Sequence, residues 1–349
     1  MGTVPRRPER RDAGVGHPGV GTDTTRGEVA VTDGSDDRRR IVDVLRDASA
    51  VTLFTHVRPD ADTMGSALAL AVALDRNGVD VEVGVPGALP VPDALTRLPG
   101  AKMVVPSDQI AGHRVAVALD CASVGRLEDL QDVFTRAETR VVIDHHASNT
   151  GFGDLDLVDA EADCTAELVL AVLDDLDAEI DADVATCLYA GLVTDTGSFR
   201  WARPGSHAIA ARLLAAGVDG PAWTRTLLDT HRFGWLAMVA DALRSAVLVP
   251  EAFGGNGLVY ACVDHTWRDA IGWDEAESVI DLVRTIGDAD VAVVFKESDP
   301  GTWTVSMRSR SATDLVPIAR AHGGGGHPHA AGFGFTGAVE DVVAAFSAA

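Results

Sequence analysis

The chain contains 349 residues, of which 52 are acidic and 29 are basic, so its formal net charge at pH 7 is −23. This length is typical of about two domains. So negative a surface disfavours binding of long duplex nucleic acid. Most of the acidity can be explained as a compositional bias that keeps a protein soluble. The apolar runs fall short of the roughly 20 residues that a membrane span needs, and residues 1–37 lack the apolar core of a signal peptide, so we expect a cytoplasmic protein without membrane contact.

The N-terminal part of the chain leads into a loop rich in metal-ligand residues. Residues 1–37 have no apolar periodicity and are expected to be disordered. A helix is predicted over 37–48, and a strand is predicted over 51–55. The strand continues into His56-Val57-Arg58-Pro59-Asp60-Ala61-Asp62, and a helical stretch follows over 66–74. One imidazole and two carboxylates at the carboxyl end of a strand fit a divalent metal site in an open α/β sheet. The loop alone fits a solvated turn as well, because Asp and Pro are common in turns.

Three further apolar runs end in acidic or imidazole residues. Asp120 follows the run 115–119, Asp144-His145-His146 follows 141–143, and Thr194-Asp195 follows 188–193. Short apolar runs bounded by turn residues are typical of buried parallel strands, whose carboxyl ends meet at one edge of a sheet. The third run is ambiguous, since 185–193 fits a buried helix equally well, but Asp195 ends it in either case.

Strand-like and helix-like segments alternate to about residue 218, which predicts an α/β domain with a doubly wound parallel sheet. Residues 221–249 are predicted to form one or two helices, because apolar residues recur at roughly helical spacing. A smaller α/β domain is expected to follow, with a strand over 257–263, a helix over 275–285, a hairpin of 290–296 and 303–307, and a final helix from Val339. The expected limits are 1–37 for the extension, 38–218 for the first domain, 219–249 for a helical connector and 250–349 for the second domain.

The four cysteines are widely spaced and include no Cys-x-x-Cys pair. Each lies in an apolar stretch, which is typical of reduced and buried thiols in a cytosolic protein. The residues are Cys121, Cys164, Cys187 and Cys262.

These segments, together with a fifth block near the C-terminus, resemble the motifs of the DHH phosphoesterase family. The first motif, His-x-x-Pro-Asp-x-Asp-x-x-Gly-Ser, extends from His56 to Ser66 with every fixed position filled. The second is the strand that ends in Asp120, the third is Asp144-His145-His146, and the fourth is Gly191-Leu192-Val193-Thr194-Asp195-Thr196-Gly197-Ser198. The block 323–333 resembles the glycine-rich signature of the DHH-associated domain. Five motifs in the family's order therefore span residues from about 51 to 333.

The resemblance implies two divalent metal ions. One would be held by His56, Asp60 and Asp120, and the other by Asp62, Asp120, His145 and Asp195, so that Asp120 bridges. Two such ions can share a water molecule, lower its pKa and present hydroxide to a phosphorus atom. The family usually takes Mn²⁺, which suits oxygen-rich ligands with two imidazoles, although the general affinity order favours Zn²⁺ or Co²⁺.

The resemblance also implies roles outside the metal ligands. His146 would orient a phosphate oxygen or protonate the leaving alkoxide, and Asp144 would either hold the adjacent imidazole in its tautomer or cap the next turn. In the second domain the glycines would form a nest of amides for a phosphate, with His327 and Arg308 as cationic donors. For Arg310 and His329, a solvated surface position and a substrate contact are equally consistent with the sequence. The expected substrate-binding residues are Arg308, Ser309, Gly324, Gly325, Gly326 and His327.

Length and architecture narrow the choice within the family. RecJ-type single-strand exonucleases are longer, and membrane-tethered cyclic dinucleotide phosphodiesterases carry transmembrane segments. Family II pyrophosphatases end in a lysine-rich motif, whereas this chain has only the two lysines Lys102 and Lys296. The type that remains is the oligoribonuclease and 3′-phosphoadenosine 5′-phosphate phosphatase, some of whose members cleave cyclic di-AMP. The expected partners are short RNA or small nucleotides, and a homodimer is left open.

Two alternatives to this enzyme are kept. A catalytically idle nucleotide-binding regulator on the same scaffold would be expected to have lost at least one metal ligand, and all six positions are filled here. A single-strand exonuclease of the RecJ type would prefer long strands.

Overall fold

The structure is a computed structural model that describes residues 34–310 and 312–348. Helix α1 (Gly34–Asp47) begins three residues before the predicted start, and Asp36 and Asp37 in its first turn suit the positive end of a helix dipole. The predicted disorder of residues 1–37 is therefore wrong for 34–37, and for 1–33 it lies outside the described residues.

The first sheet is parallel throughout and has the strand order β3-β2-β1-β4-β5-β6. Its order reverses between β1 and β4, which is the place where doubly wound sheets bind ligands at the carboxyl ends of their strands. The predicted doubly wound sheet is thus confirmed. The strands are β1 (Ala50–Phe54), β2 (Asp80–Gly84), β3 (Val104–Val105), β4 (Val115–Leu119), β5 (Thr139–Asp144) and β6 (Leu155–Val158).

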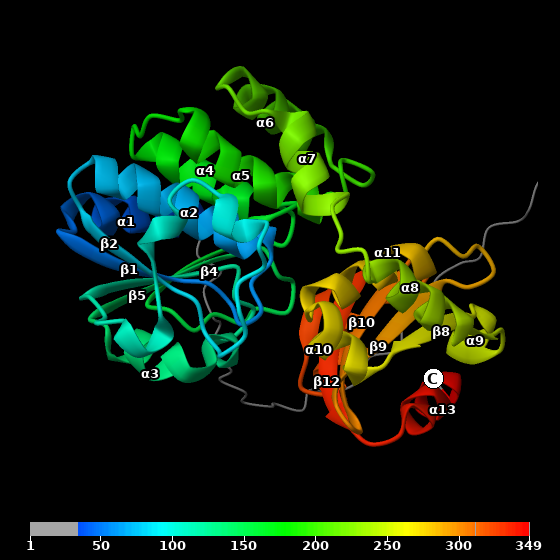
Figure 1. The fold of residues 1–349 in the computed structure, drawn as a ribbon. Helices are drawn as coiled ribbons and strands as arrows, with labels where there is room; N and C mark the ends of the chain where they lie inside the picture. The colour runs from blue at the N-terminus through cyan, green and yellow to red at the C-terminus, as the bar shows by residue number, and fades with distance from the viewer. Residues whose placement is uncertain (1–33, 311, 349) are drawn as a thin grey trace, which may run out of the picture. The chain divides into compact units, whose positions relative to one another are not determined.

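Helices α1, α2 (Ala61–Arg76), α4 (Thr165–Asp175) and α5 (Ala182–Asp195) cover one face of this sheet (Figure 1). The other face carries η4 (Val124–Leu130) and α3 (Gln131–Arg136). Helix α2 is buried from Ala61 to Leu74 because most of its side chains are small and apolar, so it packs against both the sheet and α5. The ambiguous run 188–193 lies inside α5 and is therefore helical.

Shorter helical segments connect these elements. Three of them, η1 (Leu95–Arg97), η2 (Ala101–Met103) and η3 (Ser107–Gln109), lie between β2 and β4 in the sequence. Helices α6 (Pro204–Ala215) and α7 (Gly220–Leu228) follow α5.

The second sheet has the order β11-β12-β10-β9-β8-β7, and only β8 and β9 pair in parallel. Its strands are β7 (Val247–Val249), β8 (Leu258–Val263), β9 (Val291–Asp299), β10 (Thr302–Ser309), β11 (Gly325–His327) and β12 (Ala330–Thr336). The accompanying helices are α8 (Trp235–Arg244), α9 (Ala252–Gly255), α10 (His265–Ile271), η5 (Asp274–Ser278), α11 (Val279–Val283), α12 (Val316–Ala321) and α13 (Val339–Ala348).

The predicted strand over 257–263, the hairpin of β9 and β10 and the helix from Val339 are confirmed. The helix predicted over 275–285 is instead a 3-10 segment followed by the short α11. Residues 247–249, which we predicted to lie in the helical connector, pair with β8 as an edge strand. Consecutive Val, Leu and Val side chains favour a strand over a helix.

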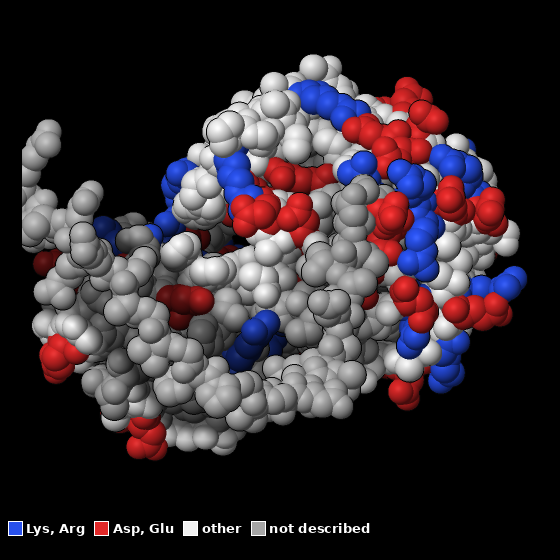
Figure 2. Space-filling model, turned by 180° about the vertical axis from the view of Figure 1, so that it is seen from behind, with Lys and Arg blue, Asp and Glu red and all other residues white. Residues whose placement is uncertain are grey.

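Charged side chains of both signs lie next to one another on the face shown in Figure 2. Exposed pairs such as Arg212 with Asp174 and Arg76 with Asp181 recur among the described residues, and each pair of this kind contributes about 0–1 kcal/mol. Within 34–310 and 312–348, no helix has both the length and the apolar character that a membrane crossing requires.

Candidate metal centre

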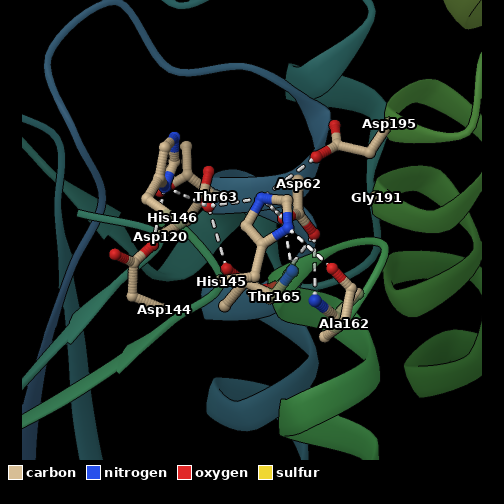
Figure 3. A network of polar contacts seen from close by, with 12 residues as sticks. Asp62, Thr63, Asp120, Asp144, His145, His146, Ala162, Thr165, Gly191 and Asp195 are labelled. Atoms are coloured by element: carbon tan, nitrogen blue, oxygen red, sulfur yellow. Dashed lines mark hydrogen bonds and ion pairs between the residues drawn. The ribbon is translucent and has the colours of Figure 1, made fainter. Parts of the chain in front are cut away.

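The polar residues at the ends of β1, β4, β5 and α5 lie together in one cluster. Figure 3 shows Asp120, His145 and Asp195 of this cluster. His56, Asp120 and His145 are each 5 % exposed or less, and Asp62 is fully buried. Carboxylates and imidazoles that are buried so close to one another require compensating charge or hydrogen bonds.

Both histidines turn the same nitrogen toward the cluster. Nδ1 of His56 lies 3.0 Å from the carbonyl oxygen of Val57, and Nδ1 of His145 lies 3.3 Å from that of Ala162. A carbonyl oxygen only accepts, so Nδ1 carries a proton in each ring, and the neutral form of each imidazole has Nε2 free to bind a cation.

Asp120 faces both histidines with different oxygens. Its Oδ2 lies 3.4 Å from Nε2 of His56, and its Oδ1 lies 3.5 Å from Nε2 of His145. Oδ1 also accepts a hydrogen bond of 2.8 Å from the hydroxyl of Thr165. Asp120 has a φ of +61°, an uncommon backbone conformation that recurs at functional sites. Its carboxylate therefore has the orientation that the bridging role requires.

The two acidic residues of the first motif are held by helix N-termini. Asp60 caps α2, where its Oδ1 accepts from the amides of Asp62 and Thr63, and its Oδ2 lies 3.4 Å from Nε2 of His56. Asp62 accepts from the amides of Thr165 (2.6 Å) and Ala166 (3.0 Å) at the start of α4. A Cβ at Gly191 would lie 2.4 Å from Oδ1 of Asp62, so only glycine leaves room for this carboxylate.

The ionisable groups of the cluster shift one another's pKa. Burial and Arg126 lower the pKa of His56, but Asp60 and Asp120 outweigh them and raise it to about 9. Burial raises the pKa of Asp195 to about 6, although His145 acts in the opposite direction. Burial, reinforced by nearby carboxylates, also raises the pKa of Asp62. The raised pKa values of Asp195 and Asp62 show that the ionised carboxylates of the cluster are destabilised when no cation is bound.

The donor set fits two divalent cations. His56, Asp60 and Asp120 form one group whose ligand atoms all lie within 4.8 Å of one another, and Asp62, Asp120 and His145 form a second. The groups share Asp120, and Asp195 meets the second one through a 3.3 Å approach of its Oδ2 to Nε2 of His145. Carboxylate oxygens combined with an imidazole suit hard or borderline ions such as Mn²⁺. The structure therefore brings together all six residues that the sequence analysis named as ligands.

His146 and Asp144 form a pair beside these groups. Nδ1 of His146 donates to Oδ1 of Asp144 over 2.7 Å, and the side-chain amide of Asn149 donates to Oδ2 over 2.7 Å. Burial alone would raise the pKa of Asp144, but His146 and Asn149 lower it to about 2. Asp144 is thus an orienting partner of His146, and of the two roles left open for it the structure favours this one over a turn cap.

His327 lies against the same histidines. Its ring centroid is 4.5 Å from that of His145 and 4.8 Å from that of His146, and its buried Nε2 has no hydrogen-bond partner among the described residues. Burial and the two neighbouring imidazoles lower its pKa to about 3. The expectation of a cationic His327 is therefore wrong for this structure, in which the ring is neutral at pH 7.

The other predicted substrate residues differ in whether their polar groups already have hydrogen-bond partners within the protein. Arg308 is half-buried, and its guanidinium donates to the carbonyl oxygen of Met307, whereas the hydroxyl of Ser309 is already bonded to the carbonyl oxygen of Thr313. The predicted amide nest is instead a strand, because Gly325–His327 forms β11. Gly324 immediately precedes that strand, and the amide of Gly326 donates to the hydroxyl of Ser148 over 3.0 Å.

Arg310 and His329, which the sequence left undecided, both have local partners. Arg310 donates to the carbonyl oxygen of Thr285, and His329 lies 2.9 Å from the hydroxyl of Ser309.

Three residues that make hydrogen bonds in or beside the cluster were not predicted. Thr165 bonds Asp120 and Asp62, Asn149 bonds Asp144, and Ser148 bonds Gly326. Asn149 and Ser148 follow the third motif by a few residues, so their proximity was available from the sequence. Thr165 lies far from every motif along the chain, and only the docking of α4 brings it there.

Comparison with known proteins matches the two halves of the chain to two families. Residues 50–192 match the DHH family, N-terminal domain, and residues 255–349 match the DHHA1 domain.

The chain is 33 % identical over 300 residues, 84 % of its length and 87 % of the relative's, to the bifunctional oligoribonuclease and PAP phosphatase NrnA of Thermus thermophilus. It is 26 % identical, over 84 % of its length and 92 % of the relative's, to a probable bifunctional oligoribonuclease and PAP phosphatase of Streptococcus mutans. Among solved structures, an exopolyphosphatase-related protein from Bacteroides fragilis matches with a TM-score of 0.77 and 23 % identity, covering 90 % of this chain and 95 % of that one. The last likeness concerns the fold alone.

Proposed function

Because the chain belongs to the DHH family and carries a DHHA1 domain after its DHH domain, we propose that it is a metal-dependent phosphoesterase that hydrolyses short oligoribonucleotides and 3′-phosphoadenosine 5′-phosphate. The observation that carries this proposal is the double orientation of Asp120, whose two oxygens face the two imidazoles His56 and His145. The names of the Thermus and Streptococcus relatives support the substrate class.

The assignment of parts follows from the ligand positions. Residues 38–218 would carry the chemistry, 250–349 would bind substrate, and 219–249 would connect them. His56, Asp60 and Asp120 would hold one ion, and Asp62, Asp120, His145 and Asp195 would hold the other. We propose Mn²⁺, and in such sites divalent cations supply a water of lowered pKa and compensate the charge of the phosphate.

The side chains have separate tasks around these ligands. His146, oriented by Asp144, would donate a proton from Nε2 to the leaving alkoxide. Thr165 would hold Asp120 in place through its hydroxyl. On the substrate side, Arg308 would pair with a phosphate of the nucleotide, and His327, neutral in this structure, would offer one N–H. Ser309 and the segment Gly324, Gly325 and Gly326 would border the substrate.

A parallel turnover assay tests this function. Purified protein with Mn²⁺ is given a diribonucleotide, 3′-phosphoadenosine 5′-phosphate and cyclic di-AMP, and the variant Asp120→Asn is the matched control. Cyclic di-AMP is included because the chain is 24 % identical, over 82 % of its length but only 44 % of the relative's, to a cyclic-di-AMP phosphodiesterase of Geobacillus thermodenitrificans. We expect turnover of the first two substrates by the wild type and of none by the variant. Binding of nucleotide without hydrolysis by the wild type would instead indicate an idle regulator.

A further inference from the structure

A half-exposed tryptophan lies directly beside the candidate metal centre. Trp201 is 47 % exposed, and its indole Nε1 donates a hydrogen bond of 2.6 Å to the carbonyl oxygen of Asp195, one of the proposed metal ligands. A tryptophan with its polar end fixed and its ring in solvent has the amphipathic form that aromatic recognition sites use. None of the roles assigned above involves this side chain.

The backbone before Trp201 is folded in an unusual way that fixes the ring. Gly197, Ser198 and Phe199 have φ values of +54°, +59° and +65°. A Cβ at Gly197 would lie only 2.0 Å from the ring of Trp201, so the indole lies directly on this glycine. Two consecutive non-glycine residues in the left-handed region are costly, and strain of this kind accumulates at functional sites. The turn therefore holds the indole in one place relative to Asp195.

A cationic side chain lies over the ring of Trp201. The guanidinium carbon of Arg284 lies 4.4 Å from the centroid of the Trp201 ring, and Arg284 is also paired with Asp281 over 2.7 Å. A second guanidinium, that of Arg308, lies close enough to Arg284 and Asp195 for their charges to act on it. Burial lowers its pKa, and the positive charge of Arg284 acts in the same direction while Asp195 acts against it. An aromatic ring that is bonded to a metal ligand and lies under a guanidinium group suits a ligand that has both a flat base and a phosphate.

Resting on the proposed function, we propose that Trp201 is the platform on which a nucleobase of the substrate stacks while the adjacent phosphate lies at the metal centre. The base takes the place of the Arg284 guanidinium over the indole, and Asp281 retains the displaced side chain. This exchange is favourable because an exposed cation–π contact is weaker than base–aromatic stacking. Trp201 is therefore a positioning residue that selects nucleotides over other phosphodiesters without reading the identity of the base.

The test compares two substrates that differ only in their bases. The diribonucleotide is compared with the matched sugar–phosphate–sugar diester that lacks both bases. Trp201→Leu should lower kcat/KM for the dinucleotide by about tenfold or more, mainly through KM, and should leave kcat/KM for the baseless diester unchanged. Trp201→Phe keeps an aromatic ring and should restore most of the loss.

Trp303→Phe is the control variant. Its indole also donates to a carbonyl oxygen, that of Gly337, but Trp303 lies in β10 and contacts none of the proposed ligands. It should behave as the wild type on both substrates. Equal losses on both substrates in Trp201→Leu, or no loss on either, would overturn the proposal, because the first outcome marks a merely structural role.

A binding measurement keeps this proposal separate from the proposed function. AMP should quench the part of the tryptophan fluorescence that is absent in Trp201→Phe, whether or not any substrate is hydrolysed. A wild type that hydrolyses neither substrate but shows this quenching would refute the phosphoesterase function and retain the platform. Identical quenching in the wild type and Trp201→Phe would refute the platform, even in an active enzyme.

Discussion

Nδ1 of His146 donates to Oδ1 of Asp144 over 2.7 Å, and this contact determines which ring nitrogen remains available. With Nδ1 engaged by a carboxylate that His146 and Asn149 keep ionised despite its burial, Nε2 is the atom that can exchange a proton with a substrate. The first prediction follows from this pair.

We predict that His146→Ala lowers kcat by about 10²- to 10⁴-fold, the usual contribution of a general acid or base, while the protein retains its metal ions. Asp144→Asn should also lower kcat, because an amide can present its NH₂ group to Nδ1 and favour the wrong tautomer. His145→Ala is the contrasting variant and should lose metal occupancy instead. If His146→Ala keeps kcat near the wild-type value with both ions bound, His146 has no catalytic role.

Thr165 should matter through metal binding rather than through substrate. Its hydroxyl donates to Oδ1 of Asp120 over 2.8 Å, and loss of such a contact to a metal ligand typically costs about 10- to 100-fold in metal affinity or activity. We therefore expect Thr165→Val to weaken Mn²⁺ binding, measured by titration calorimetry, and Thr165→Ser to bind as the wild type. Equal affinity in the wild type and in both variants would show that Asp120 needs no such support.

Metal binding should release protons. In the metal-free protein Asp60 and Asp120 outweigh the effects of burial and Arg126 and raise the pKa of His56 from 6.5 to about 9, so an ion must displace a proton from Nε2 below that pH. Apparent Mn²⁺ affinity should thus rise with pH up to about 9 and then level off. Because the pKa of His56 is higher in the folded protein than in the unfolded chain, protonation of His56 stabilises the metal-free fold. This contribution is fully present below pH 6.5 and is lost as the pH rises through about 9. Calorimetry in buffers of different ionisation enthalpy measures the release, and affinity independent of pH between 6.5 and 9 would contradict it.

The protein should prefer short substrates. With a net charge of −23, phosphates beyond the first few would meet a surface that offers little attraction. We expect kcat/KM to be higher for a dinucleotide than for a single strand of about 24 nucleotides, with added salt narrowing the difference because it screens the repulsion. A higher kcat/KM on the long strand would favour the exonuclease alternative.

The sequence predicted most of what lies at the ends of the first sheet's strands. Parallel strands converge at one edge, so Asp120 and the Asp144-His145-His146 run could be placed beside the His56 loop from their positions after apolar runs alone. Asp195 could be placed although its element was left open between strand and helix, because it ends the apolar run in either case.

Contacts that depend on tertiary packing were not predictable. Thr165 reaches Asp120 only because α4 docks its N-terminus on Asp62. The neutral state of His327 follows from burial against two other imidazoles, which no local pattern encodes. Trp201 looked like any aromatic residue after a motif, and its significance depends on the left-handed turn that places it on Gly197.

The most direct test of the account is the number of ions per chain in wild type and in Asp120→Asn. Oδ1 and Oδ2 of Asp120 face different histidines, so loss of one oxygen's charge should weaken both sites together. Mass spectrometry under native conditions, or elemental analysis of Mn²⁺-loaded protein, should find two ions in the active wild type. The folded variant should bind both ions more weakly and should be inactive. A fully active wild type that holds a single Mn²⁺ ion per chain would contradict the account.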